Sequence, residues 1–114
     1  NNTYISMVTV SGSYLYVGFD NATDGATVYR TSGTGTSPTW TQVGVAGFGP
    51  TGATAGARAK NKHIISNAQV FYNGKNYLYV TMGCLSDFSD NGVCDRNSNT
   101  GSTDFSIKVF RQID

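Results

Sequence analysis

The segment from Asp95 to Asp104 has the residue types and the spacing that could bind a metal ion. Oxygen-bearing side chains occupy alternate positions, Gly101 permits a turn, and an aspartate closes the segment. Ca²⁺ takes about six to eight oxygen ligands, so this pattern suits calcium. The alternative is a hydrated loop that binds no metal. The predicted calcium ligands are Asp95, Asn97, Asn99 and Asp104.

Two cysteines, Cys84 and Cys94, lie ten positions apart in the same polar stretch and could close a small disulfide. The composition is rich in Gly, Ser, Thr and Asn, and only 13% of residues are charged. Such a composition is typical of secreted β proteins, in which disulfides persist. We therefore expect a Cys84–Cys94 disulfide in an extracellular or cell-surface protein. A pair of reduced thiols is the alternative.

Catalytic chemistry has little support in the sequence. The chain contains no glutamate, and most of its acidic residues occur in predicted turns and loops. Asp87, Asp90 and Asp95 could be read as a carboxylate pair for glycoside hydrolysis, but their clustering fits turn chemistry better. No nucleophile motif accompanies His63, the only histidine, and Ser66 lies on the same predicted strand. We therefore expect a protein that is not an enzyme.

Aromatic residues at matching strand positions could instead form a binding surface. A sugar ring stacks well on an exposed aromatic face, whereas core or cross-strand packing would explain the same residues without a ligand. The candidate ligand-binding residues are Tyr14, Tyr16, Tyr77, Tyr79 and Trp40.

Two further features concern the surface of the protein. Asn1 and Asn21 each begin an Asn-x-Thr acceptor sequence for N-glycosylation, and the second is expected on an exposed turn. A small basic group at Arg58, Lys60 and residues 62–63 is expected to belong to a solvated loop.

The elements that must position these residues are β-strands. Apolar residues alternate with polar ones in several short runs, and Gly-containing turns separate them. Asn73-Gly74 is a strong signal for a type I′ hairpin turn. The expected strands are Tyr4–Val10, Tyr14–Phe19, Ala26–Thr31, Trp40–Val43, His63–Tyr72, Tyr77–Met82 and Phe105–Ile113.

The chain contains an internal repeat. Tyr14-Leu15-Tyr16-Val17 recurs as residues 77–80, and Val28-Tyr29-Arg30 has a counterpart at residues 109–111. Repeats at this scale indicate an architecture built from stacked units. The predicted organisation is a first unit at 1–43, a Gly/Ala-rich connection at 44–62, and a second unit at 63–114.

These motifs, together with Trp40-Thr41-Gln42-Val43 and Gly47-Phe48-Gly49, resemble a blade of the bacterial secreted β-propeller repeat proteins. Residues 31–35, followed by Thr39-Trp40, also resemble a degenerate Asp-box in which Gly33 takes the place of the aspartate. The second unit matches the first part of the blade pattern. The resemblance implies an all-β fold of antiparallel four-stranded meanders, with two propeller-like units and the second lacking its last strand. The alternative is a β-sandwich that takes a donated strand.

The expected function follows from the composition and from this resemblance. A net charge of +1 gives no support for nucleic-acid binding, and no apolar run approaches the roughly 20 residues of a membrane span. We expect an extracellular, non-enzymatic binding or adhesion module that recognises glycan or protein. It would act through self-association or within a larger parent chain. Alternatives are a structural subunit of a surface fibre or ring, and a fragment of a sialidase-like propeller enzyme.

Overall fold

The computed structural model describes residues 1–21, 23–33, 35–48, 61–83 and 108–114, and its regular structure there is entirely antiparallel β-sheet. Sheet A has four strands in the order β1-β2-β3-β4, and sheet B has three in the order β5-β6-β7. The all-β fold with successive antiparallel meanders is therefore confirmed. The strands are β1 Tyr4–Ser11, β2 Tyr14–Asp20, β3 Thr27–Thr31, β4 Thr41–Val43, β5 His63–Tyr72, β6 Lys75–Gly83 and β7 Lys108–Ile113.

Turn chemistry accounts for the two long hairpins. Asn73 and Gly74 have φ angles of 51° and 75°, as a type I′ turn requires of both central residues. In the β1–β2 hairpin, Gly12 has a φ of 60°, which a glycine adopts without steric cost. The sequence prediction of both hairpins is confirmed by the strand pairing.

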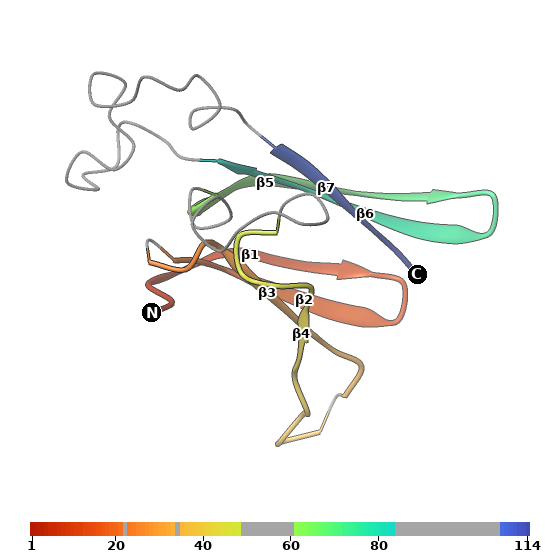
Figure 1. The fold of residues 1–114 in the computed structure, drawn as a ribbon. Helices are drawn as coiled ribbons and strands as arrows, with labels where there is room; N and C mark the ends of the chain where they lie inside the picture. Colours follow the sequence, from red (N-terminus) through yellow and green to blue (C-terminus); the bar gives the residue numbers. More distant parts are fainter. Residues whose placement is uncertain (22, 34, 49–60, 84–107) are drawn as a thin grey trace.

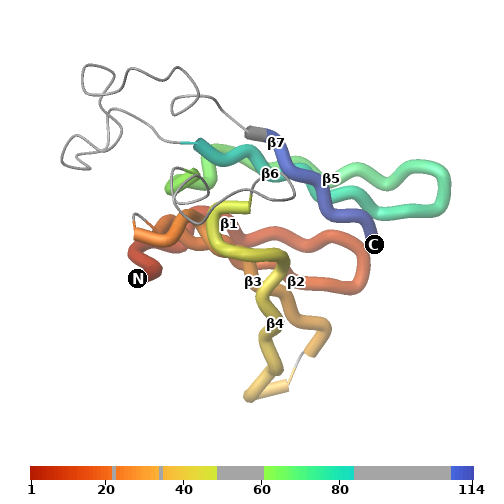
Figure 2. Tube along the Cα trace, in the orientation of Figure 1, coloured from red at the N-terminus to blue at the C-terminus, as the bar shows by residue number. Residues whose placement is uncertain are grey.

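The two sheets stack face to face, with the β1–β2 hairpin beneath the β5–β6 hairpin and the two turns at the same end (Figure 1). The tube trace shows β3 and β4 diverging from the overlying sheet (Figure 2). The two sheets meet where β1 and β2 contact β5, and where β1 contacts β6. Between them lies one apolar core, consisting of Met7, Tyr16, Ala26, Val28, Ile64, Leu78, Val80 and Met82.

Each strand turns one face to this core and the other away from it. In β1 the buried face is the more polar one, because Thr9 and Ser11 lie inside with Met7 whereas Val8 and Val10 remain 63% and 62% exposed. The side chain of Gln69 donates a hydrogen bond to Thr9 across the two sheets. This choice of face leaves apolar side chains on the outside of sheet A.

A buried polar contact joins the sheets at the end of β2. Asp20 Oδ1 accepts a hydrogen bond from the Ile64 amide at 3.0 Å, and its Oδ2 lies 3.2 Å from Nδ1 of His63. Lys62 and His63 are 4% and 6% exposed. The expectation that residues 62–63 belong to a solvated loop is therefore wrong, because both side chains are buried; Arg58 and Lys60 lie outside the described residues.

The segment before β5 is fixed to sheet A through its backbone. The Asn21 amide donates to the carbonyl of Lys62 at 3.0 Å, and the Ala26 amide donates to that of Asn61 at 2.7 Å. The buried side chain of Asn61 donates to the Gly47 carbonyl at 2.7 Å. These bonds set the position of sheet B along sheet A, since they hold the start of β5 against the β2–β3 turn.

Candidate binding surfaces

The outer side of sheet B presents aromatic and apolar side chains to solvent. Strand alternation places Leu78 and Val80 in the core and turns the tyrosines on either side of Leu78 outward. The rings of Tyr77 and Tyr79 are stacked with centroids 6.5 Å apart, and the Arg111 guanidinium lies 5.7 Å from the centre of the Tyr77 ring. We call this surface outer face B and define it by Ala68, Val70, Tyr77, Tyr79, Val109 and Arg111.

The outer side of sheet A is also apolar. The rings of Phe19 and Tyr29 meet edge to face at 6.0 Å, and with Asn2, Val17 and Trp40 they line a shallow hollow of about 300 Å³. Trp40 is 41% exposed there. We call this surface outer face A and define it by Ile5, Val8, Val10, Val17, Phe19 and Tyr29.

On the core side of sheet A, two tyrosines and an arginine lie beside the Asp114 carboxylate. The Arg30 guanidinium lies 4.1 Å from the centre of the Tyr14 ring and forms a 2.8 Å ion pair with the Asp114 carboxylate. Tyr16, which is fully buried, donates its phenolic hydrogen to the same carboxylate. Burial, then the hydrogen bond to Asp114, raises the pKa of Tyr16 to about 12. The pKa of Arg30 is raised as well, chiefly by the hydrogen bond between Arg30 and Tyr16.

The raised pKa of Tyr16 predicts a loss of stability at alkaline pH. The unfolded chain releases the Tyr16 proton near pH 10, whereas the folded protein retains it until about pH 12. Stabilisation of the neutral phenol is thus fully present below pH 10 and is lost as the pH rises from 10 to 12. Two pKa units correspond to about 3 kcal/mol. The free energy of unfolding, measured by chemical denaturation from pH 8 to 12, should show a decline that is absent from the Tyr16→Phe variant. Equal dependence on pH in the two proteins would contradict the assignment.

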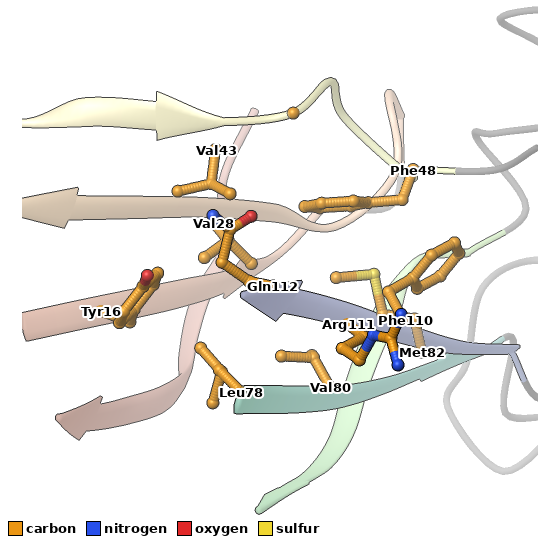
Figure 3. A pocket seen from close by; sticks show the side chains of 11 residues that line it. Tyr16, Val28, Val43, Phe48, Leu78, Val80, Met82, Phe110, Arg111 and Gln112 are labelled. Atoms are coloured by element: carbon orange, nitrogen blue, oxygen red, sulfur yellow. The ribbon is translucent and has the colours of Figure 1, made fainter. Parts of the chain in front are cut away.

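The sheets separate on the side of β3, β4 and β7, which leaves a cavity of about 270 Å³ between them. Figure 3 shows Tyr16, Val28 and Val43 on one wall, with Leu78, Val80 and Phe110 facing them. Phe48 packs on Phe110 with ring centroids 5.2 Å apart. The lining is largely apolar, which makes the cavity a continuation of the core.

The five aromatic candidates from the sequence do not form one surface. Tyr16 lies in the core and Tyr14 is half-buried beside Arg30, so packing explains both of them. Tyr77 and Tyr79 lie on outer face B, and Trp40 borders outer face A. The same motif therefore faces inward in the first unit and outward in the second.

The predicted glycosylation sites differ in their environment. Asn1 is exposed, and its side chain donates to Asp24 at 3.1 Å. Asn21 is 3% exposed: its Oδ1 accepts hydrogen bonds from the turn backbone, and its Nδ2 donates to Asn2 at 3.1 Å. The expectation of an accessible Asn21 amide is therefore wrong, because the side chain caps the turn from within.

The predicted calcium ligands, namely Asp95, Asn97, Asn99 and Asp104, lie outside the described residues, as do Cys84 and Cys94. Calcium binding and the Cys84–Cys94 disulfide therefore stay predictions. Within the described ranges, no three His, Cys, Asp or Glu side chains gather in a way that could hold a metal ion.

The charged partners of the aromatic rings were not predicted from the sequence. Arg30 and Arg111 looked like ordinary strand residues, and Asp114 follows the last predicted strand. The available signal was the shared Val-x-Arg motif of the two units, because Arg30 pairs with Tyr16 and Arg111 pairs with Tyr79 at the same place in each ladder.

The fold and these surfaces define a two-layer, all-β repeat protein whose two outer faces are apolar. No family model, curated protein or solved structure matches the chain. In the part of the chain that the structure describes, there is no helix with the length and apolar character needed to cross a membrane.

Proposed function

We propose that this protein is an extracellular, non-enzymatic recognition module that acts as part of a larger assembly and binds protein through its two outer faces. The observation that carries the proposal is the exposure of apolar residues on both sides of the sheet pair. Val109 is 62% exposed, whereas Val28 at the matching position of sheet A is 2% exposed. Contiguous exposed apolar surface of this kind marks an interaction site more often than a free surface.

Protein is favoured over a charged partner by the chemistry of these faces. Outer face A is defined entirely by apolar and aromatic residues, and outer face B has one charged side chain, Arg111, among apolar ones. Burial of such surface contributes about 25 cal/mol for each Å² removed from water, which must offset the entropy that is lost on association. The runner-up function is that of a structural subunit in a fibre or ring, which would use the same two faces.

The solution mass of the wild-type protein and of Val8→Lys tests this proposal. Val8 is 63% exposed on outer face A, so a lysine there should leave the fold intact while placing a charge in any complex. We expect wild type to form species larger than a 12.1 kDa monomer in light scattering, and Val8→Lys to shift them toward monomer. Thr36→Lys, on the exposed loop before β4, is the charge-matched control. A wild-type monomer at all concentrations contradicts the proposal.

Glycan recognition is a second candidate, and the hollow on outer face A favours it. Trp40 and Tyr29 line the hollow and could stack on a sugar ring. Asn2 lies beside them, and its Oδ1 accepts hydrogen bonds from Asn21 and Thr27. A glycan array probed with wild type and Trp40→Ala would test it. Sugar binding that Trp40→Ala abolishes supports this function, whereas binding that is unchanged in Trp40→Ala excludes this hollow as the site.

A further inference from the structure

The two sheets are related residue by residue through their strand register. Tyr16 pairs with Arg30 in sheet A, and Tyr79 pairs with Arg111 in sheet B. The first strand of each sheet carries an irregularity at the same place, directly after Ile5 and directly after Ile64. Position 5 of the first unit therefore matches position 64 of the second, and position 16 matches position 79.

This register exchanges the two sides of the sheets. Tyr16 and Val28 face the core, but their counterparts Tyr79 and Val109 lie on outer face B. Conversely, Ile64 is buried, whereas its counterpart Ile5 lies on outer face A and is 65% exposed. Outer face B therefore corresponds, position by position, to the core side of sheet A. Outer face A corresponds in the same way to the core side of sheet B.

We infer that a second copy of this chain stacks on the first in the same direction, with its outer face A covering outer face B of its neighbour. The inference rests on the proposed function, because it names the partner of the same two faces. Such a contact joins two different surfaces, so it can be repeated and builds a ring or a filament. The contact between sheets A and B is the template for its geometry.

The exchanged residues differ where the template is tightest. A Cβ at Gly18 would lie 2.3 Å from Cδ1 of Ile64 and 3.1 Å from Cβ of Met7. The template therefore has no room for a side chain at position 18. Gly18 pairs with Met7 in sheet A, and in sheet B the matching pair is Thr81 with Ser66, whose hydroxyl oxygens lie 2.7 Å apart. Thr81 carries a side chain where Gly18 has none, so Ile5 of the second copy would have to lie further from sheet B than Ile64 lies from Gly18.

One contact of the template is missing from the stacked copies. In the template, Asp114 of the second unit receives Tyr16 and Arg30. Asp114 follows Arg111 by three positions, so its counterpart three positions after Arg30 is Gly33. A stacked copy would therefore present a glycine to Tyr79 and Arg111 instead of a carboxylate. The arrangement predicts that an aspartate at position 33 strengthens self-association.

Gly33→Asp is compatible with the fold of one chain. Gly33 is exposed, its φ is not in the left-handed region, and a Cβ there would approach Pro38 Cβ at 3.3 Å and Thr31 Oγ1 at 3.4 Å. These contacts need shifts of a few tenths of an ångström. Gly35→Asp is the matched control, because it adds the same charge two residues further on, where no atom lies within 4 Å of the new Cβ.

Sedimentation equilibrium of the two variants and of wild type tests the stacking. Gly33→Asp should tighten self-association about tenfold, because a charge-assisted hydrogen bond to arginine contributes at least about 1.5 kcal/mol. Gly35→Asp should not, and Gly33→Asp should give no such gain over the Arg111→Gln variant when it is introduced in that background. If Gly33→Asp has no effect, or Gly35→Asp acts equally, the stacking is overturned. Should Val8→Lys still weaken association in that case, the proposed function survives with another partner geometry.

Discussion

Replacing Gly18 by alanine is expected to destabilise the protein by about 1–3 kcal/mol, the usual cost of adding atoms to a packed core. The new Cβ would lie 2.3 Å from Cδ1 of Ile64 and 3.1 Å from Cβ of Met7. Neither neighbour has free space, since Ile64 is 6% and Met7 is 3% exposed. The two sheets would therefore have to separate or the isoleucine would have to leave its position.

Urea unfolding of Gly18→Ala, Gly35→Ala, Ile64→Ala and the Gly18→Ala/Ile64→Ala double variant measures this effect. Gly18→Ala should lower the midpoint strongly, and Gly35→Ala, where the added Cβ meets nothing within 4 Å, should change it little. Ile64→Ala in the Gly18→Ala background should be less damaging than Ile64→Ala in wild type, because the shorter side chain removes the clash. Additive effects of the two substitutions would show that Gly18 and Ile64 are not in contact.

Replacing Asp20 by alanine is expected to cost about 2–3 kcal/mol. Asp20 is 8% exposed, and its two carboxylate oxygens contact the Ile64 amide and the His63 ring. Alanine would leave the buried Ile64 amide without an acceptor, and an unsatisfied buried donor costs about 1–3 kcal/mol. The contact also holds the start of β5 on sheet A, so its loss weakens the packing of the two sheets.

Different substitutions at Asp20 distinguish the roles of its two carboxylate oxygens. Asp20→Asn keeps one side-chain oxygen for the Ile64 amide and should cost less than Asp20→Ala. Asp24→Ala removes a carboxylate on the exposed part of the same turn, where Asn1 is its partner, and should change stability by less than about 0.5 kcal/mol. Thermal unfolding of the three variants gives the comparison. Equal losses for Asp20→Ala and Asp24→Ala would mean that Asp20 has no role between the sheets.

The strands and turns could be predicted from the sequence because both depend on local properties. Alternation of apolar residues placed β1, β2, β5 and β6, and Asn73-Gly74 placed a hairpin turn that the φ angles confirm. Where the predicted ends lie in described residues, they differ from the observed ends by at most two residues; residues 105–107 of the last predicted strand lie outside the described residues. Trp40, expected as the anchor of a strand, precedes β4 and borders outer face A instead.

The sides of the strands could not be predicted from alternation, because both sides of β1 and β2 carry apolar residues. Alternation shows that Met7 and Val8 point in opposite directions but does not show which of them is buried. Which of the two is buried depends on the register in which sheet B packs on sheet A. That register depends on contacts of Asp20, Asn61 and Ile64, which join residues that are far apart in the sequence.

The tyrosines show the same limit at the candidate site. Equivalent positions in a repeat suggested one surface, but stacking in a single direction buries Tyr16 and leaves Tyr79 half-buried on outer face B. The repeat itself was visible in the sequence. Its consequence, that the two outer faces are counterparts of the two core faces, required the paired registers of both sheets.

Disulfide trapping between copies tests the stacking of outer face A on outer face B most directly. Gln69 donates a hydrogen bond to Thr9 between the sheets, and the matching positions on the outer faces are Val10 and Ala68. Val10→Cys and Ala68→Cys should each give no more cross-linked dimer than wild type when oxidised alone, and should cross-link to one another when mixed. Cross-linking of either variant with itself, or none in the mixture, would contradict the account.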